Sequence, residues 1–127
     1  MNIPNKLKYS KDHIWVRVEG DTATVGITDF AQSELGDVVY VDIEKKEGEK
    51  EKQNAILGSV ESVKTVSDLF MPVTGEVTEI NTQMNDEPAL INSDPYGKGW
   101  IIKVKIKDQE EVKNLLSSEE YKKVIAE

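Results

Sequence analysis

Residues 58–80, GSVESVKTVSDLFMPVTGEVTEI, are the stretch that decides the fold. Two runs rich in β-branched residues flank its centre, Val63-Lys64-Thr65. The flanking positions roughly mirror each other, with Val63 against Thr65 and Glu61-Ser62 against Ser67-Asp68. We therefore predict a β-hairpin with Lys64 at its apex, although the Asn-Gly turn that makes such a prediction strong is missing.

An apical lysine keeps its amine in water, within reach of a second protein's active site. That geometry suits a lysine that is acylated and then swung between catalytic pockets, whereas a buried lysine would suit Schiff-base or proton-transfer chemistry. Lys64 is, however, one of 15 lysines. A lysine between β-branched residues also commonly protects an exposed strand from pairing with another chain. The local pattern leaves both interpretations open.

Short strand signals surround this hairpin on both sides. Alternating or β-branched runs predict strands at residues 14–19, 22–27, 38–43, 55–60, 69–73, 76–80 and 100–106. Between them, Thr28-Asp29 is a plausible cap for a short helix that ends at Gly36. The charged stretch at 44–52 is predicted to be a solvated loop with a turn at Gly48.

The C-terminal part has helical spacing, over residues 109–116 and 118–126. Ser117 and Glu120 have the form of a capping box for the second helix. We favour a helical tail that folds back over the barrel rather than a helix offered to a partner. Its apolar positions are Val112, Leu115, Leu116, Tyr121, Val124 and Ile125.

The pattern as a whole predicts a β-rich α+β domain, a sandwich or flattened barrel. With 127 residues the chain is long enough for one ordinary domain.

The net charge of -8 argues against nucleic acid or an anionic membrane as partners and suits a monomer that meets several proteins briefly. There is no Cys and one His, which disfavours disulfides and a structural zinc site. No signal, transit or spanning segment is evident, so we expect a cytoplasmic protein, with a processed organelle protein as the alternative.

Several motifs resemble the H-protein family of the glycine cleavage system, in order and over nearly the whole chain. At the hairpin, Glu61-Ser62-Val63-Lys64 with Ser67-Asp68 is similar to that family's lipoylation site. The other matching segments are Tyr9 with His13 and Trp15, residues 26–39, residues 72–77 with Asn81, and residues 90–96 with Gly99-Trp100.

The resemblance implies a barrel-sandwich hybrid of the lipoyl/biotinyl-carrier type, with a short internal helix and C-terminal helices. Residues 1–127 would form one lipoyl-carrier domain, with the hairpin at about 55–80 and the helical tail at about 109–127. Lipoic acid would be joined by an amide to Lys64. Glu61 and Asp68 would help in recognition of the attachment site, although on their own they also fit a solvated hairpin face.

The resemblance also implies a shuttle rather than an enzyme. A glycine decarboxylase would load the arm with an aminomethyl group, and a tetrahydrofolate-dependent aminomethyltransferase would take the methylene. Dihydrolipoyl dehydrogenase would then reoxidise the arm, and a lipoylating enzyme would attach it in the first place. The chemistry would belong to the cofactor and these partners.

One departure from the family pattern is Ile14, which stands where the family usually has Glu. That carboxylate is expected to line the cleft of the loaded arm, a task for which Asp12 or Asp68 could compensate. The departure keeps a second hypothesis open, a relative that relays lipoyl groups to other complexes. His13 fits a structural role.

An enzyme is the third hypothesis and the weakest. No nucleophile elbow, metal cluster or phosphate-binding glycine loop appears, and Ser59 and Ser62 have no evident base. A biotin carrier is disfavoured because Val63 and Thr65 stand where methionines are usual.

Overall fold

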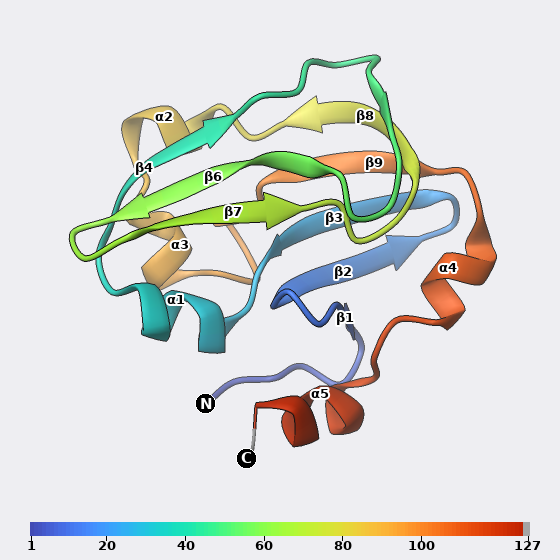
Figure 1. The fold of residues 1–127 in the computed structure, drawn as a ribbon, viewed down its shortest axis with the longest axis horizontal. Helices are drawn as coiled ribbons and strands as arrows, with labels where there is room; N and C mark the ends of the chain where they lie inside the picture. The colour runs from blue at the N-terminus through green and yellow to red at the C-terminus, as the bar shows by residue number, and fades with distance from the viewer. Residues whose placement is uncertain (126–127) are drawn as a thin grey trace.

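The computed structural model describes residues 1–125 as two antiparallel sheets with short helices around them (Figure 1). One sheet has six strands in the order β1-β2-β3-β9-β8-β5, and the other has three in the order β4-β6-β7. The predicted β-rich hybrid of sandwich and barrel is confirmed. The strands are β1 (Lys8–Tyr9), β2 (Ile14–Glu19), β3 (Thr22–Ile27), β4 (Val38–Ile43), β5 (Lys50–Glu51), β6 (Ile56–Ser62), β7 (Val66–Phe70), β8 (Gly75–Ile80) and β9 (Ile102–Ile106).

The predicted internal helix is present, and two further helices were not predicted. Helix α1 (Asp29–Leu35) begins at Thr28, whose side chain accepts a hydrogen bond from the Ala31 backbone, and ends at Gly36 with φ 79°. Single turns at α2 (Gln83–Asp86) and α3 (Leu90–Ser93) are too short to give a periodic signal. No helix within residues 1–125 is long and apolar enough to cross a membrane.

Several strand predictions differ from the structure: the ends of β6 and β8 are shifted by one or two residues, and three larger differences follow. The run at 69–73 is not a strand of its own, because β7 is Val66–Phe70 and Pro72 cannot donate to a ladder. The last strand begins at Ile102 rather than at residue 100. Within the charged stretch, Lys50–Glu51 pairs with β8, although propensity alone would leave such residues in a loop.

The main core lies between the two sheets. Val25, Val77 and Val104 of the six-stranded sheet and Val60 and Leu69 of the three-stranded sheet are buried members of one cluster. Strand β2, in contrast, is covered on both faces. Ile14 and Val16 belong to the main core, whereas Trp15 between them lies in a second cluster formed largely by the N- and C-terminal segments.

Trp15 is accommodated by a glycine on the paired strand. Gly26 lies opposite Trp15, and a Cβ built on Gly26 would lie 2.7 Å from the indole ring. The indole nitrogen donates to the Pro95 carbonyl at 2.9 Å. Gly26 is therefore a packing requirement, since any side chain there would displace the tryptophan.

The C-terminal segment folds back onto this second cluster, as predicted. Helix α4 (Gln109–Lys113) ends earlier than expected, and Leu116 then pairs with Tyr9 through two backbone hydrogen bonds of 2.9 and 2.8 Å. Helix α5 (Ser118–Val124) has the predicted capping box of Ser117 and Glu120. Val124, which the helical spacing predicts on the apolar face, is exposed. The ends of the predicted helix (Ala126) and tail (Glu127) lie outside the described residues.

Hydrogen bonds join α5 to His13, just before β2, and to Thr28, just after β3. The Tyr121 hydroxyl lies 2.7 Å from Thr28 Oγ1 and 2.8 Å from His13 Nδ1, and its ring stacks on Tyr9 with centroids 4.7 Å apart. Burial raises the pKa of Tyr121 to about 12. Burial lowers the pKa of His13, while nearby Asp12 and Glu34 act in the opposite direction. A neutral His13 that accepts the phenol proton fits both shifts.

These hydrogen bonds predict that acid weakens the fold, because protonation of His13 opposes its bond to Tyr121. The pKa of His13 is lower in the folded state than the ordinary value of about 6.5, so the unfolded chain binds the proton first. The contribution of His13 is complete above about pH 6.5 and is lost as the pH falls below it. Asn tolerates the positive φ of 66° at this position and does not titrate. Thermal unfolding from pH 8 to pH 5.5 should therefore show a smaller loss of stability in His13→Asn than in wild type. Parallel pH profiles would contradict the assignment.

Candidate functional site

The predicted hairpin is formed by β6 and β7, and its tip lies at one end of the molecule (left in Figure 1). Glu61 pairs with Val66, and the Ser62 amide donates to the Thr65 carbonyl at 2.8 Å. The loop is therefore two residues, Val63 and Lys64. The predicted apex at Lys64 is therefore wrong by half a residue, because the centre of the hairpin lies between Val63 and Lys64.

The Ser62 side chain shapes this loop. Its hydroxyl is buried and accepts from the backbone amides of Lys64 at 3.2 Å and Thr65 at 3.1 Å, and it lies 3.2 Å from the Thr65 carbonyl, to which it can donate. Two-residue hairpins usually need positive φ, hence Asn-Gly, but here neither Val63 nor Lys64 has it. The hydroxyl stabilises the loop instead. We did not predict this role, although the preference of serine for turns was a signal.

Beneath the loop lies the Gly36–Asp37 backbone, here called the loop seat. The Asp37 carbonyl accepts from the Val63 amide at 3.0 Å. A Cβ built on Gly36 would lie 3.0 Å from Lys64 Cε, so the lysine stem crosses the glycine closely. Lys64 is exposed despite this contact. The C-cap glycine of α1 thus serves two purposes, ending the helix with φ 79° and leaving room for the lysine.

Asn92 of α3 fixes the loop seat from the other side. Its side-chain amide donates to the Gly36 carbonyl at 2.8 Å and to Gln32 Oε1 at 3.0 Å. Its oxygen accepts from the Val38 amide at 2.9 Å. One side chain therefore ties together α1, the seat and the start of β4. In the sequence Asn92 stands only within a matching motif and has no evident role, because its partners are more than 50 residues away in the chain.

Glu61 and Asp68 both lie on exposed parts of the hairpin. Asp68 pairs with Ser59, two residues before Glu61, so strand alternation puts the two carboxylates on one face, diagonally across the pair of strands. Neither is in an ion pair within the described residues. Both are thus available to another molecule, as the predicted recognition role requires, but they do not converge on Lys64.

A groove of about 420 Å³ begins one residue beyond Lys64 and runs along β7, which we call the β7 groove. Its apolar part includes Ile27, Leu35 and Leu69, which are buried. Its rim carries carboxylates. The lining residues are Asp12, His13, Ile27, Phe30, Ala31, Glu34, Leu35 and residues 65–69. An apolar floor with an acidic rim suits a flexible apolar chain that ends in a cationic group.

Ile14 is not among the residues that line the β7 groove. It pairs with Ile27 and is 1% exposed, within the main core behind the groove. The carboxylates on the rim are Asp12 and Asp68, which we named as candidates to compensate, and Glu34 of α1, which we did not. All three are exposed.

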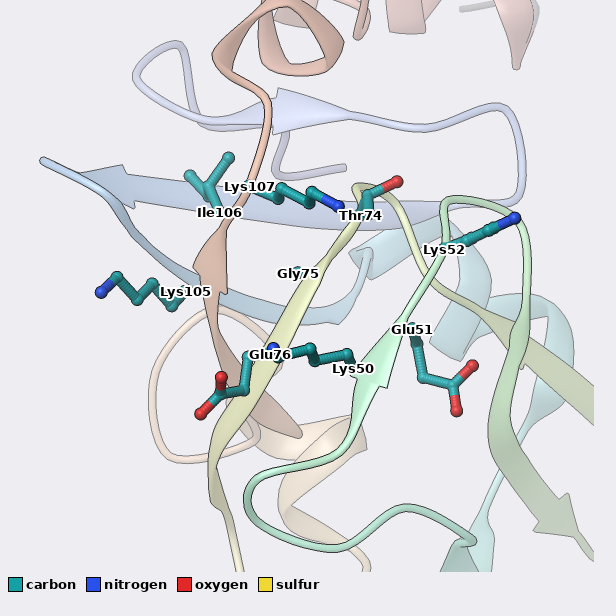
Figure 2. A pocket seen from close by; sticks show the side chains of 9 residues that line it. All are labelled: Lys50, Glu51, Lys52, Thr74, Gly75, Glu76, Lys105, Ile106 and Lys107. Carbon is teal, nitrogen blue, oxygen red and sulfur yellow. The ribbon is translucent and has the colours of Figure 1, made fainter.

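A second groove, of about 460 Å³, lies at the opposite end of the molecule between β5, β8 and β9. It is lined by four lysines, but the amines of Lys52 and Lys105 point to opposite sides (Figure 2). Glu51 is paired with Lys45 at 2.9 Å. Because the cations do not converge, this groove has no centre at which an anion would be held, and the candidate site remains at the hairpin.

Comparison with known proteins agrees with the resemblance found in the motifs. A family model described as glycine cleavage H-protein matches residues 7–127. The glycine cleavage system H protein of Staphylococcus carnosus is 51% identical over 127 residues, which is 100% of both chains. The crystal structure of a glycine cleavage system H protein from Mycobacterium marinum has a TM-score of 0.86 and 37% identity, and the match covers 98% of this chain and 100% of that one. This chain belongs to the glycine cleavage H-protein family.

Proposed function

We propose that this protein is a lipoyl carrier of the glycine cleavage system, with lipoic acid attached to Lys64. The observation that carries the proposal is the position of Lys64. It lies in a short, hydrogen-bonded loop next to an apolar groove, and its side chain is exposed. Membership of the family supports it. The residues present fit the group: an exposed amine is available for acylation, and the groove could receive an apolar chain.

Each part of the site has a role in this function. Ser62 and the loop seat hold the loop, so that the amine is presented at a fixed place. When bound, lipoate supplies a dithiol/disulfide pair that can carry a one-carbon unit between active sites. The β7 groove offers an apolar surface to its hydrocarbon part, and its acidic rim favours a cationic end. The bond-making chemistry then belongs to other proteins.

The partners would be glycine decarboxylase, the aminomethyltransferase, dihydrolipoyl dehydrogenase and a lipoylating enzyme. A tether raises the concentration of its end at each active site, so the carrier itself needs only brief contacts. A net charge of -8 suits such contacts with basic surfaces. A monomeric state and cytoplasmic residence stay predictions.

Lipoylation is expected at Lys64 and at no other lysine. Intact mass and peptide mapping after treatment with lipoate, ATP and a lipoate–protein ligase should find one added lipoyl group. Lys64→Arg should prevent the modification, because a guanidinium stays protonated, and should change the unfolding free energy by no more than about 0.5 kcal/mol. Lys107→Arg, at the far groove, is the matched control and should be modified like wild type. Label on another lysine would disprove the assignment.

A second candidate function, relay of lipoyl groups to other complexes, is favoured by Ile14. The family usually has a carboxylate at this position, where this chain has an isoleucine that is buried in the core behind the groove. The two functions differ in the partner that uses the modified chain.

Glycine-dependent release of CO₂ by glycine decarboxylase distinguishes the two functions. The lipoylated chain should support this reaction. The control is the unmodified wild-type chain, because Lys64→Arg cannot carry lipoate at this position. If the lipoylated chain supports no CO₂ release but donates its lipoyl group to the lipoyl domain of another complex, relay is its function.

Ile14→Glu is expected to weaken the fold. The side chain is 1% exposed among apolar neighbours, so a carboxylate there is stripped of water. We expect a loss of roughly 2–4 kcal/mol at pH 7. Burial raises the pKa of such a carboxyl group, so the loss should be smaller near pH 4, where the group is protonated in the folded state and largely protonated in the unfolded state. Ile14→Gln, which does not titrate, is the control. Urea unfolding at both pH values measures this, and a loss independent of pH would show that the new carboxylate reaches water.

A further inference from the structure

Exposed apolar side chains gather on the three-stranded sheet and its hairpin loop. The large hydrophobic residues that are strongly exposed within the described chain are Met1, Val39, Tyr40, Ile56, Val63, Val66 and Val124. Five of these seven belong to the three-stranded sheet or to its hairpin loop. Single exposed hydrophobic residues are ordinary, but a cluster beside a functional group marks an interaction surface.

Strand pairing places two of these residues, with Glu61 between them, in a row beside the loop. Tyr40 of β4 lies opposite Glu61 of β6, and Glu61 lies opposite Val66 of β7. Their neighbours Val41 and Val60 are buried, so alternation directs this row, which we call the outer row, away from the core. Tyr40 is 55% exposed and Val66 62%.

A bulge in β4 widens the apolar surface. The pairing of β4 with β6 shifts between Val38 and Tyr40, which leaves Val39 as an extra residue. A bulge of this kind breaks the alternation, so Val39 and Tyr40 are both exposed although they are consecutive. Val63, 68% exposed in the loop, lies next to Lys64.

The charges on this sheet have one sign. Strands β4, β6 and β7 contain no Lys, Arg or His, and their charged residues are Asp42, Glu61 and Asp68. Lys64 is the cation at the edge of this surface. A partner that covers it must therefore combine apolar side chains with basic ones.

We propose that Val39 and Tyr40 of β4 extend the surface by which the lipoylating enzyme recognises this chain. The inference rests on the proposed function and deepens it. Before modification there is no long arm, so the enzyme's active site has to come within one lysine side chain of the loop. Its surface then covers the residues beside the loop, and the outer row supplies the apolar area there. Tyrosine is among the residues that contribute most at such contacts.

The kinetics of lipoylation test this proposal. With lipoate, ATP and a lipoate–protein ligase, Tyr40→Ser should raise the KM for this chain roughly tenfold and leave kcat within about twofold. Tyr40→Phe should retain most of the wild-type KM, because the ring provides the contact. Ile56→Ser is the matched control, since Ile56 is 45% exposed at the other end of β6. Val39→Ser should shift KM in the same direction as Tyr40→Ser. Melting temperatures of all variants show that they are folded.

A wild-type KM for Tyr40→Ser, or an equal rise for Ile56→Ser, overturns the inference and leaves the proposed function intact. Sedimentation of the wild type should show a monomer. A dimer that Tyr40→Ser abolishes, together with an unchanged KM, would instead assign the surface to a second copy of this chain. Absence of lipoate from wild-type Lys64 overturns the proposed function and this inference together.

Discussion

Burial of Val60 at the centre of the three-stranded sheet is the constraint on which the hairpin depends. Val60 is flanked by Val41 on β4 and Ser67 on β7, and it packs into the main core. Because side chains alternate along a strand, burying Val60 sends Glu61 to the outer face and turns Ser62 inward. A slip of one residue would bury Glu61 and expose Val60. The core thus fixes the register, and the register fixes where the loop falls.

The inward turn of Ser62 then decides how the loop is built. A buried hydroxyl has to be satisfied, and here it is satisfied by the loop's own backbone. This replaces the glycine-containing turn that a two-residue hairpin usually needs. The loop seat stabilises the loop further, because the Asp37 carbonyl accepts a hydrogen bond from the Val63 amide and Asn92 donates one to the Gly36 carbonyl. The lysine is therefore carried by a rigid base while its amine stays in water, as suits a group that several proteins must reach.

Two surfaces beside the hairpin differ in character and meet at Val66, which lines the groove and also belongs to the outer row. The β7 groove has an apolar floor and an acidic rim, close to α1. The outer row, which runs from Val66 across the sheet to Tyr40, is open and partly apolar. The groove suits a tethered chain and the outer row suits a protein surface, so the proposed place of the arm and the proposed docking surface adjoin beside Lys64.

The sequence by itself determined the elements that depend on local signals. The cap at Thr28, the helix end at Gly36, the capping box at Ser117 and the hairpin around Lys64 follow from residues within a few positions of one another. The family and the class of fold were also evident from the motifs. Tertiary structure alone decided the features that join distant segments. Asn92 meets Gly36, Trp15 requires Gly26, Tyr121 bonds to His13, and Ile14 is buried in the core rather than along the groove. Tertiary structure also decided that Lys50–Glu51 forms a strand. These residues have little strand propensity of their own, but they pair with the edge of β8. The reason is physical: caps and turns are satisfied within a few residues, whereas burial and long-range hydrogen bonds exist only once the sheets have packed.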